Sequence, residues 1–95
     1  TFNGYLPIKR SERSRAILNL ERLSKKKKQT QIFMETPYRN QQLFDDILKT
    51  CSQHTKLCIA SNISDQNELI QTKTISEWKS QKINIHKQPT IFLIE

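Results

Sequence analysis

Glycine is almost missing from this sequence, because Gly4 is the single glycine among 95 residues. Both the G-x-G-x-x-G turn and the P-loop need several glycines, since their backbone must approach a phosphate group closely. Neither kind of nucleotide-binding loop can therefore form within these residues. Gly4 itself is expected to serve a special backbone angle or a close approach, which glycine tolerates better than any other residue.

Long apolar runs are missing as well. No segment approaches the roughly 20 apolar residues that cross a bilayer, and no cleavable signal is recognisable. The sequence therefore predicts a cytoplasmic protein without a membrane partner. Hydrophobic residues make up only 35% of the composition, which is low for a free-standing domain. We expect some apolar surface to be completed by a partner or by a further segment.

Side chains for metal or covalent chemistry are few and scattered. Cys51 and Cys58 have the surroundings of small buried hydrophobic residues, which predicts reduced thiols. No spacing of cysteine and histidine matches a zinc site, and no serine occupies a nucleophile elbow. Asp45 and Asp46 are adjacent on an expected helix, so they face different directions and make a poor acid–base pair. The chain alone is not expected to be a complete enzyme.

Positive charge is concentrated in the first third of the chain. The formal net charge is +7, and residues 1–28 carry nine of the 16 basic residues but only two of the nine acidic ones. The remaining residues are therefore neutral overall. A regional excess of this kind suits a polyanion, with RNA the first candidate. The run Lys25–Lys28 is expected to be a solvated connector.

The hydrophobic pattern predicts one α/β domain over residues 1–95, in the order β-α-β-α-β-β-α-β. We expect a mixed sheet of about five strands, mostly buried and flanked by helices. The expected strands cover residues 2–7, 32–34, 56–60, 67–73 and 91–94.

Three helices are expected between these strands. The first is capped by Ser11 and ends near Ser24, with Arg13 pointing away from its buried face. The second follows Asn40 as its N-cap. The third is short, and the Thr74-Ile75-Ser76-Glu77 sequence at its start fits a capping box.

The polar turn at residues 35–40 is the first candidate for a site. It lies between a short buried strand and a helix, and ligands of open α/β sheets bind outside the carboxyl ends of strands. Glu35, Tyr38 and Arg39 are therefore placed where a ligand would bind. Two interpretations stay open: either Glu35 and Arg39 form a local ion pair that fixes the turn, or they contact a ligand. Tyr38 either packs against a neighbour or stacks on a ligand base.

Several short motifs together resemble a known family. They are Gly4-Tyr5-Leu6-Pro7 followed by Lys9, Arg10 and Arg13, then Glu35-Thr36-Pro37-Tyr38-Arg39, and Pro89-Thr90-Ile91-Phe92. The combination resembles the C-terminal half of the tetrapyrrole (corrin/porphyrin) methylase superfamily. Within it, the chain looks most like the branch that 2′-O-methylates a ribose in small-subunit ribosomal RNA. Thr36 and Tyr38 stand where that branch usually has serine and histidine.

The resemblance implies the C-terminal domain of a two-domain methyltransferase, with S-adenosylmethionine bound between the domains and its own N-terminal domain as the first partner. It implies that the strand ends supply the adenosine side of the pocket through Met34, Glu35, Thr36, Pro37, Ala60, Asn62, Pro89 and Thr90. It also implies that the substrate lies near Gly4, Pro7 and Lys9. Tyr38 and Arg39 are expected to contact the substrate as well. Lys9, Arg10 and Arg13 are expected to contact its phosphates.

Other functions stay open at this point. The methyl acceptor could be a corrin or porphyrin instead of ribosomal RNA. The chain could also be a non-enzymatic RNA-binding module, which its charge favours but its shortage of exposed aromatic residues opposes. A third reading is an interaction domain that pairs through its surface, and a homodimer is among the expected assemblies.

Overall fold

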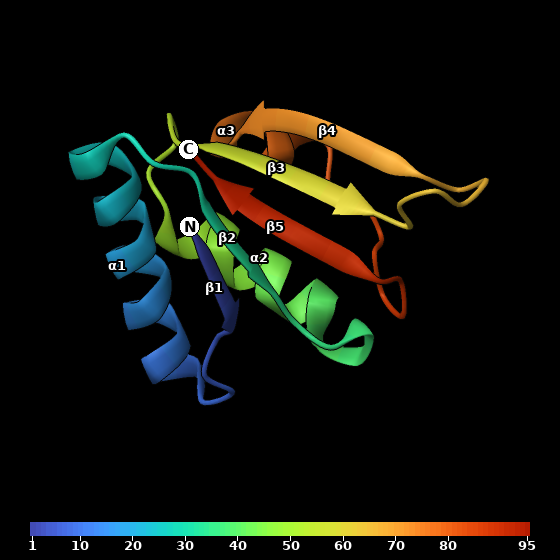
Figure 1. Cartoon of the computed structure of the whole chain (residues 1–95), viewed down its shortest axis with the longest axis horizontal. Helices are drawn as coiled ribbons and strands as arrows, with labels where there is room; N and C mark the ends of the chain where they lie inside the picture. The colour runs from blue at the N-terminus through green and yellow to red at the C-terminus, as the bar shows by residue number, and fades with distance from the viewer.

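Five strands form one mixed sheet in the computed structural model, which describes residues 1–95 (Figure 1). The strands are β1 (Phe2–Tyr5), β2 (Gln31–Met34), β3 (Lys56–Ser61), β4 (Leu69–Thr74) and β5 (Thr90–Ile94). Their order across the sheet is β1-β2-β5-β3-β4. β1 is parallel to β2, while the pairs β2–β5, β5–β3 and β3–β4 are antiparallel. The expected α/β class, with a mixed five-stranded sheet flanked by helices, is confirmed.

The helices are α1 (Arg10–Lys27), α2 (Asn40–Thr50) and α3 (Ile75–Ser80), and a 3-10 turn η1 (Pro37–Arg39) precedes α2. The expected bounds of α1 are wrong at both ends. Its N-cap is Lys9, without a side-chain cap, and the helix continues through the lysine run as far as Lys27. Lysine is a good helix former, and cations in the last turn interact favourably with the helix dipole. The lysines are therefore mostly part of the helix, not a connector.

The start of α2 also differs from the expectation. Pro37 opens the η1 turn, and proline suits a first helical position because its missing N–H would be unpaired there anyway. Asn40 is consequently the first residue of α2 and not its N-cap, and its buried side chain donates to the backbone carbonyl of Gln88. The capping box of α3 is confirmed, because Glu77 N–H donates to Thr74 Oγ1 (3.2 Å) and Thr74 N–H donates to Glu77 Oε1 (3.0 Å).

One face of the sheet, the covered face, packs against the helices and forms the core (Figure 1). The strand residues of this face that are fully buried are Phe33, Leu57, Ile59, Phe92 and Ile94. Phe33 and Phe92 stack with ring centroids 5.8 Å apart. From α3, Trp78 is also fully buried, and its indole N–H donates to the carbonyl of Leu57 at 2.8 Å. The covered face thus holds one contiguous hydrophobic cluster.

The opposite face, which we name the open face, carries no helix. Cross-strand pairing arranges its apolar residues in two rows: Tyr5, Met34, Ile91, Ala60 and Ile70 in one, and Phe2, Ile32, Leu93 and Cys58 in the other. None of these residues belongs to the core cluster. The expectation of a mostly buried sheet is therefore wrong for this face. Cys58, expected to be buried, is only half-buried because it lies in the second row.

Gly4 lies at an irregularity in the pairing of β1 with β2, and this irregularity puts both Phe2 and Tyr5 on the open face. The β1–β2 pairing shifts between Phe2, which pairs with Ile32, and Tyr5, which pairs with Met34. The backbone at Gly4 has a φ of +70°, and a Cβ there would meet nothing within 4 Å. Glycine is therefore required for its backbone angle and not for space. Four non-glycine residues also have positive φ angles: Lys28, Asn62, Ser64 and Lys87.

Candidate functional site

The carboxyl ends of three strands meet at one edge of the sheet. β1, β2 and β3 run in the same direction, because β1 is parallel to β2 and both β2 and β3 are antiparallel to β5. The end of β2 at Met34, the end of β3 at Ser61 and the start of β5 at Thr90 therefore lie along the same edge. Loops that leave strands at such an edge are the usual place for a ligand in α/β proteins.

A cleft of about 300 Å³ lies at this edge. Its lining residues are Tyr5, Met34, Glu35, Pro37, Ala60, Ile63, Pro89, Thr90 and Ile91. The walls are mostly apolar, and their polar side-chain groups are the carboxylate of Glu35 and the hydroxyls of Tyr5 and Thr90. Apolar walls with a few fixed polar groups are typical of small-molecule sites.

The cleft gathers six of the eight residues that the sequence assigned to the adenosine side of a cofactor pocket, all except Thr36 and Asn62. Asn62 has a left-handed backbone (φ 52°) and its side-chain amide donates to Gln88 Oε1 at 3.0 Å, so it stabilises the loop beside the cleft. The N–H of Thr36 donates to its neighbour Glu35 at 2.8 Å. The structure thus brings together three chain segments that are far apart in sequence.

Sequence reasoning missed three lining residues. Tyr5 ends β1, so the same strand-end rule could have indicated it. Ile91 lies opposite both Met34 and Ala60 in the sheet, and the alternation of β5 carries a signal for it. Ile63 lies in a polar loop and is half-exposed. No pattern in the sequence distinguishes it from an ordinary loop residue.

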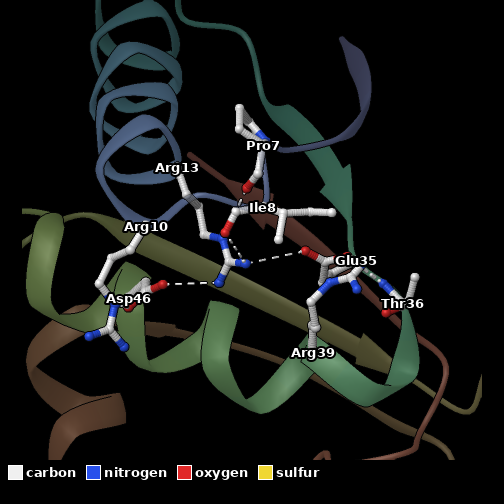
Figure 2. Close-up of polar contacts among 8 residues, drawn as sticks. All are labelled: Pro7, Ile8, Arg10, Arg13, Glu35, Thr36, Arg39 and Asp46. Carbon is white, nitrogen blue, oxygen red and sulfur yellow. Dashed lines mark hydrogen bonds and ion pairs between the residues drawn. The ribbon is translucent and has the colours of Figure 1, made fainter.

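A chain of ion pairs runs beneath the cleft, centred on Arg13 (Figure 2). The Arg13 guanidinium lies 3.0 Å from Asp46 Oδ2 and 3.7 Å from Glu35 Oε2, and the residue is only 1% exposed. It also donates to the backbone carbonyls of Pro7 and Ile8, both at 3.2 Å. Arg13 therefore ties the loop before α1 to the polar turn after β2 and to α2.

The burial of Arg13 corrects the sequence analysis, which placed it on the outer side of α1 and on a phosphate. A guanidinium held by two carboxylates and two carbonyls does not reach an external phosphate. Arg10, which lies 3.5 Å from Asp46 with 67% of its side chain exposed, remains accessible. Lys9 is exposed as well. Together, Lys9 and Arg10 are the accessible cations at this end of α1.

The polar turn combines a local ion pair with unpaired polar atoms. Arg39 Nη2 lies 3.2 Å from Glu35 Oε1, so the expectation of a local pair that fixes the turn is confirmed. Four buried side-chain atoms have no hydrogen-bond partner: Glu35 Oε2, Thr36 Oγ1, Arg39 Nε and Asn40 Oδ1. Buried polar atoms are normally paired, and Glu35 Oε2 has a charged group nearby, the Arg13 guanidinium at 3.7 Å. Tyr38 is 72% exposed and does not pack into the core.

A second buried carboxylate, that of Glu21 on α1, lies apart from the cleft. It accepts hydrogen bonds from the N–H of Ser52 (2.8 Å) and from the hydroxyl of Thr55, so it ties α1 to the loop before β3. Burial, together with the charge of Glu21, raises the pKa of the Cys51 thiol to about 12. Cys51 is therefore an unreactive thiol at neutral pH. No group of three or more metal-ligating side chains forms, and no helix is long and apolar enough to cross a membrane.

No protein-family model matches this sequence, and no curated protein matches it. Among solved structures, the crystal structure of the methyltransferase CobJ is similar, with a TM-score of 0.52 and 10% sequence identity. The match covers 98% of this chain and 40% of that chain. A likeness at this identity concerns the fold alone. This chain therefore has the fold of a part of a methyltransferase, and it spans less than half the length of that structure.

Proposed function

We propose that this chain is the cofactor-holding domain of an S-adenosylmethionine-dependent methyltransferase of the tetrapyrrole methylase type. The observation that carries the proposal is the cleft at the strand-end edge. Six residues that the motif resemblance assigned to the adenosine side line this one cleft. The fold shared with part of a methyltransferase supports the same function.

The residues present fit the adenosine part of this cofactor. The cleft of about 300 Å³ is at the small end of ligand sites, which span roughly 300–1,000 Å³. It suits a nucleoside held between apolar walls, and the rest of the cofactor then needs a second wall. A further domain, on the N-terminal side in the family that the motifs resemble, would supply that wall.

Each group of this chain has a defined part in the proposed site. Met34, Ala60 and Ile91 offer apolar contact to the base, while the Glu35 carboxylate and the Tyr5 hydroxyl, both on residues that line the cleft, offer hydrogen bonds to sugar hydroxyls or to an amino group. When bound, the cofactor supplies an electrophilic methyl group, which passes to a nucleophilic oxygen, nitrogen or carbon as a proton leaves. The chain orients the reactants and excludes water.

We further propose that the methyl acceptor is RNA, and ribosomal RNA is the case that the motifs favour. Lys9 and Arg10 are exposed where the loop after β1 enters α1, close to the cleft edge. From there, the exposed cations of α1 continue along a helix of 18 residues, which is about 27 Å long. A tetrapyrrole, the alternative acceptor, is too small to contact this whole length. The substrate contacts proposed near the cleft are therefore Gly4, Pro7, Lys9, Arg10, Tyr38 and Arg39.

Nuclear magnetic resonance titration of the 95-residue chain tests the cofactor site. Adenosine and S-adenosylhomocysteine should shift the amide signals of cleft residues such as Met34 and Ile91, whereas methionine should not, because only the nucleoside side lies here. Ala60→Leu should fill the cleft and weaken this binding at least about tenfold. Cys58→Leu, two residues away on the same strand and outside the cleft, is the matched control. A folded chain without shifts at about 5 mM adenosine would exclude the site.

A second candidate function is a non-catalytic RNA-binding module, which the exposed basic residues of α1 favour. On α1, Arg15 and Arg22 are both exposed and lie along one stretch of the helix surface with Ala16, Leu18 and Asn19. RNA binding by the chain with a steep salt dependence, combined with no response to adenosine, would support this function. Charge reversal at Arg15 and Arg22 should then weaken binding more than reversal at Lys9 and Arg10, and the proposed methyltransferase predicts the opposite ranking.

A further inference from the structure

We propose that Gln88 is a positioning residue of the cleft, which holds the loop after β3 in the shape that nucleoside binding needs. This inference rests on the proposed function, because the ligand concerned is the nucleoside part of that cofactor. Gln88 lies two residues before β5 and does not line the cleft itself. Its hydrogen bonds nevertheless reach both sides of β5, so it joins walls of the cleft that come from distant parts of the chain.

The start of β5 lies between the two outer walls of the cleft. Ile91 pairs with Met34 at the end of β2, and Thr90 pairs with Ser61 at the end of β3. The wall on the β3 side continues past this last pair into a loop, where Ile63 lines the cleft. Ile63 is 51% exposed and belongs to no strand or helix. Its position is therefore set by the contacts of its neighbours and not by packing in the core.

The side-chain oxygen of Gln88 supports this loop. Gln88 Oε1 accepts hydrogen bonds from Asn62 Nδ2 at 3.0 Å and from Ser61 Oγ at 3.3 Å. The backbone carbonyl of Pro89 accepts from the N–H of Asn62 at 2.9 Å. Because proline has no N–H of its own, the backbone cannot return a second hydrogen bond here, and the side chain of Gln88 provides the further contacts. The connection between β5 and β3 is thereby extended beyond the last strand pair.

The backbone of Gln88 is fixed to the opposite wall. Its carbonyl accepts from the buried side-chain amide of Asn40 on the first turn of α2, and from Thr90 Oγ1 at 2.9 Å. The N–H of the preceding residue, Lys87, donates to the carbonyl of Pro37, which lines the cleft, at 2.9 Å. Gln88 is therefore held against the polar turn and α2, and from there its side chain reaches the β3 loop. One residue thus links the two outer walls.

The backbone angles of the β3 loop show where this support is needed. Asn62 and Ser64, on either side of Ile63, have φ angles of 52° and 69°, which residues other than glycine seldom adopt without local support. The N–H of Ser64 donates to Glu68 Oε1 at 2.8 Å, so this position is supported within the loop. At Asn62 the supporting partner of the side chain is Gln88. Removal of the Gln88 oxygen should therefore release Asn62 from its left-handed angle and Ile63 from the cleft.

Adenosine titration of the 95-residue chain, followed by nuclear magnetic resonance, tests the inference with variants of Gln88 and Asn62. Gln88→Leu keeps a side chain of similar size without the acceptor, so the adenosine dissociation constant should rise about five- to tenfold. Gln88→Glu keeps an oxygen acceptor, so its constant should stay within about twofold of wild type. Asn62→Gly keeps the left-handed angle without the donor. Added to Gln88→Leu, it should weaken binding by less than about a further twofold, because both changes remove the same contact.

The amide signal of Ile63 distinguishes positioning from a general loss of stability. Saturating adenosine should shift this signal in wild type and in Gln88→Glu, whereas in Gln88→Leu it should shift Met34 and Ile91 but not Ile63. A folded chain that is merely less stable would show all three shifts. Without ligand, the amide of Asn62 should exchange with solvent at least about tenfold faster in Gln88→Leu than in wild type, while the amide of Ile59 in β3 should keep its rate.

Two results would overturn the inference while the proposed cofactor site stands. One is a Gln88→Leu variant that binds adenosine as tightly as wild type and still shifts Ile63. The other is a Gln88→Glu variant as weak as Gln88→Leu, because the oxygen acceptor would then not be the group that matters. A folded wild-type chain that gives no shifts with adenosine removes the cofactor site itself, and the inference falls with it. The two kinds of failure are therefore told apart by the wild-type titration.

Discussion

The covered and open faces of the sheet are built from alternate residues of the same strands, and both are apolar. Along β5, Phe92 and Ile94 are fully buried against the helices, while Ile91 and Leu93 between them are only half-buried. Only the covered face therefore contributes fully to the stability of the isolated chain. The apolar character of the open face brings the folded chain little burial, so we attribute it to contacts outside the chain. The low hydrophobic content of the sequence is in keeping with this division.

The largest effect should come from the charged residue buried on the covered side. Arg13→Met removes the buried cation that pairs with Asp46 and Glu35. Their buried negative charges are then only partly compensated, so the free energy of unfolding should fall by about 3–5 kcal/mol. Arg10→Met is the matched control, because Arg10 pairs with the same Asp46 from an exposed position and should cost less than about 1 kcal/mol. Urea denaturation of both variants measures the difference. Similar losses would show that burial does not set the strength of this network.

The second-largest loss of stability is expected on the covered face of β5, and the adjacent residue on the open face provides the comparison. Ile94→Ala creates a cavity in the core and should lower the free energy of unfolding by about 2–5 kcal/mol. Leu93→Ala removes a similar side chain from the open face, so the loss should be below about 1 kcal/mol. The measurement is chemical denaturation of both variants. Equal losses would mean that the open face is packed within the monomer, against the structure.

The smallest effect concerns the capping box that begins α3 at the edge of the covered face. Thr74→Ala should cost about 1 kcal/mol. Hydrogen bonds from the backbone N–H and then from the hydroxyl of Thr74 lower the pKa of Glu77 below its ordinary 4.5. The stabilisation by Glu77 is therefore complete above pH 4.5 and lost as the pH falls through the lowered pKa. The stability difference between wild type and Glu77→Gln should accordingly shrink in acid, and a constant difference from pH 7 to about pH 2 would contradict the role of the charge.

Local signals in the sequence were enough to predict the order of elements and much of the candidate site. Alternation and short apolar runs located the strands, and the capping box at Thr74 located α3, because these signals depend on neighbours along the chain. The strand-end rule indicated the polar turn after β2. It worked because β1, β2 and β3 run in one direction, so residues distant in sequence meet at one edge.

Features that depend on tertiary contacts were not predictable. The sequence favoured an exposed Arg13, since no pattern shows that Asp46 and two backbone carbonyls would surround its guanidinium. The lysine run likewise looked like a connector, although helix propensity and the dipole extend α1 through it. The sequence did not indicate that one face of the sheet is open, because β2, β3 and β5 are apolar on both faces. That pattern is typical of strands buried on both sides.

The near absence of glycine has a consequence for the heat tolerance of this fold. Lys28, Asn62, Ser64 and Lys87 adopt left-handed backbone angles that glycine usually occupies, and each costs on the order of 1 kcal/mol for a side chain that is not glycine or asparagine. Lys28 and Lys87 are both exposed, so their side chains have few contacts to lose. Glycine substitutions at Lys28 and Lys87 should therefore raise the melting temperature of the chain without any change to its core.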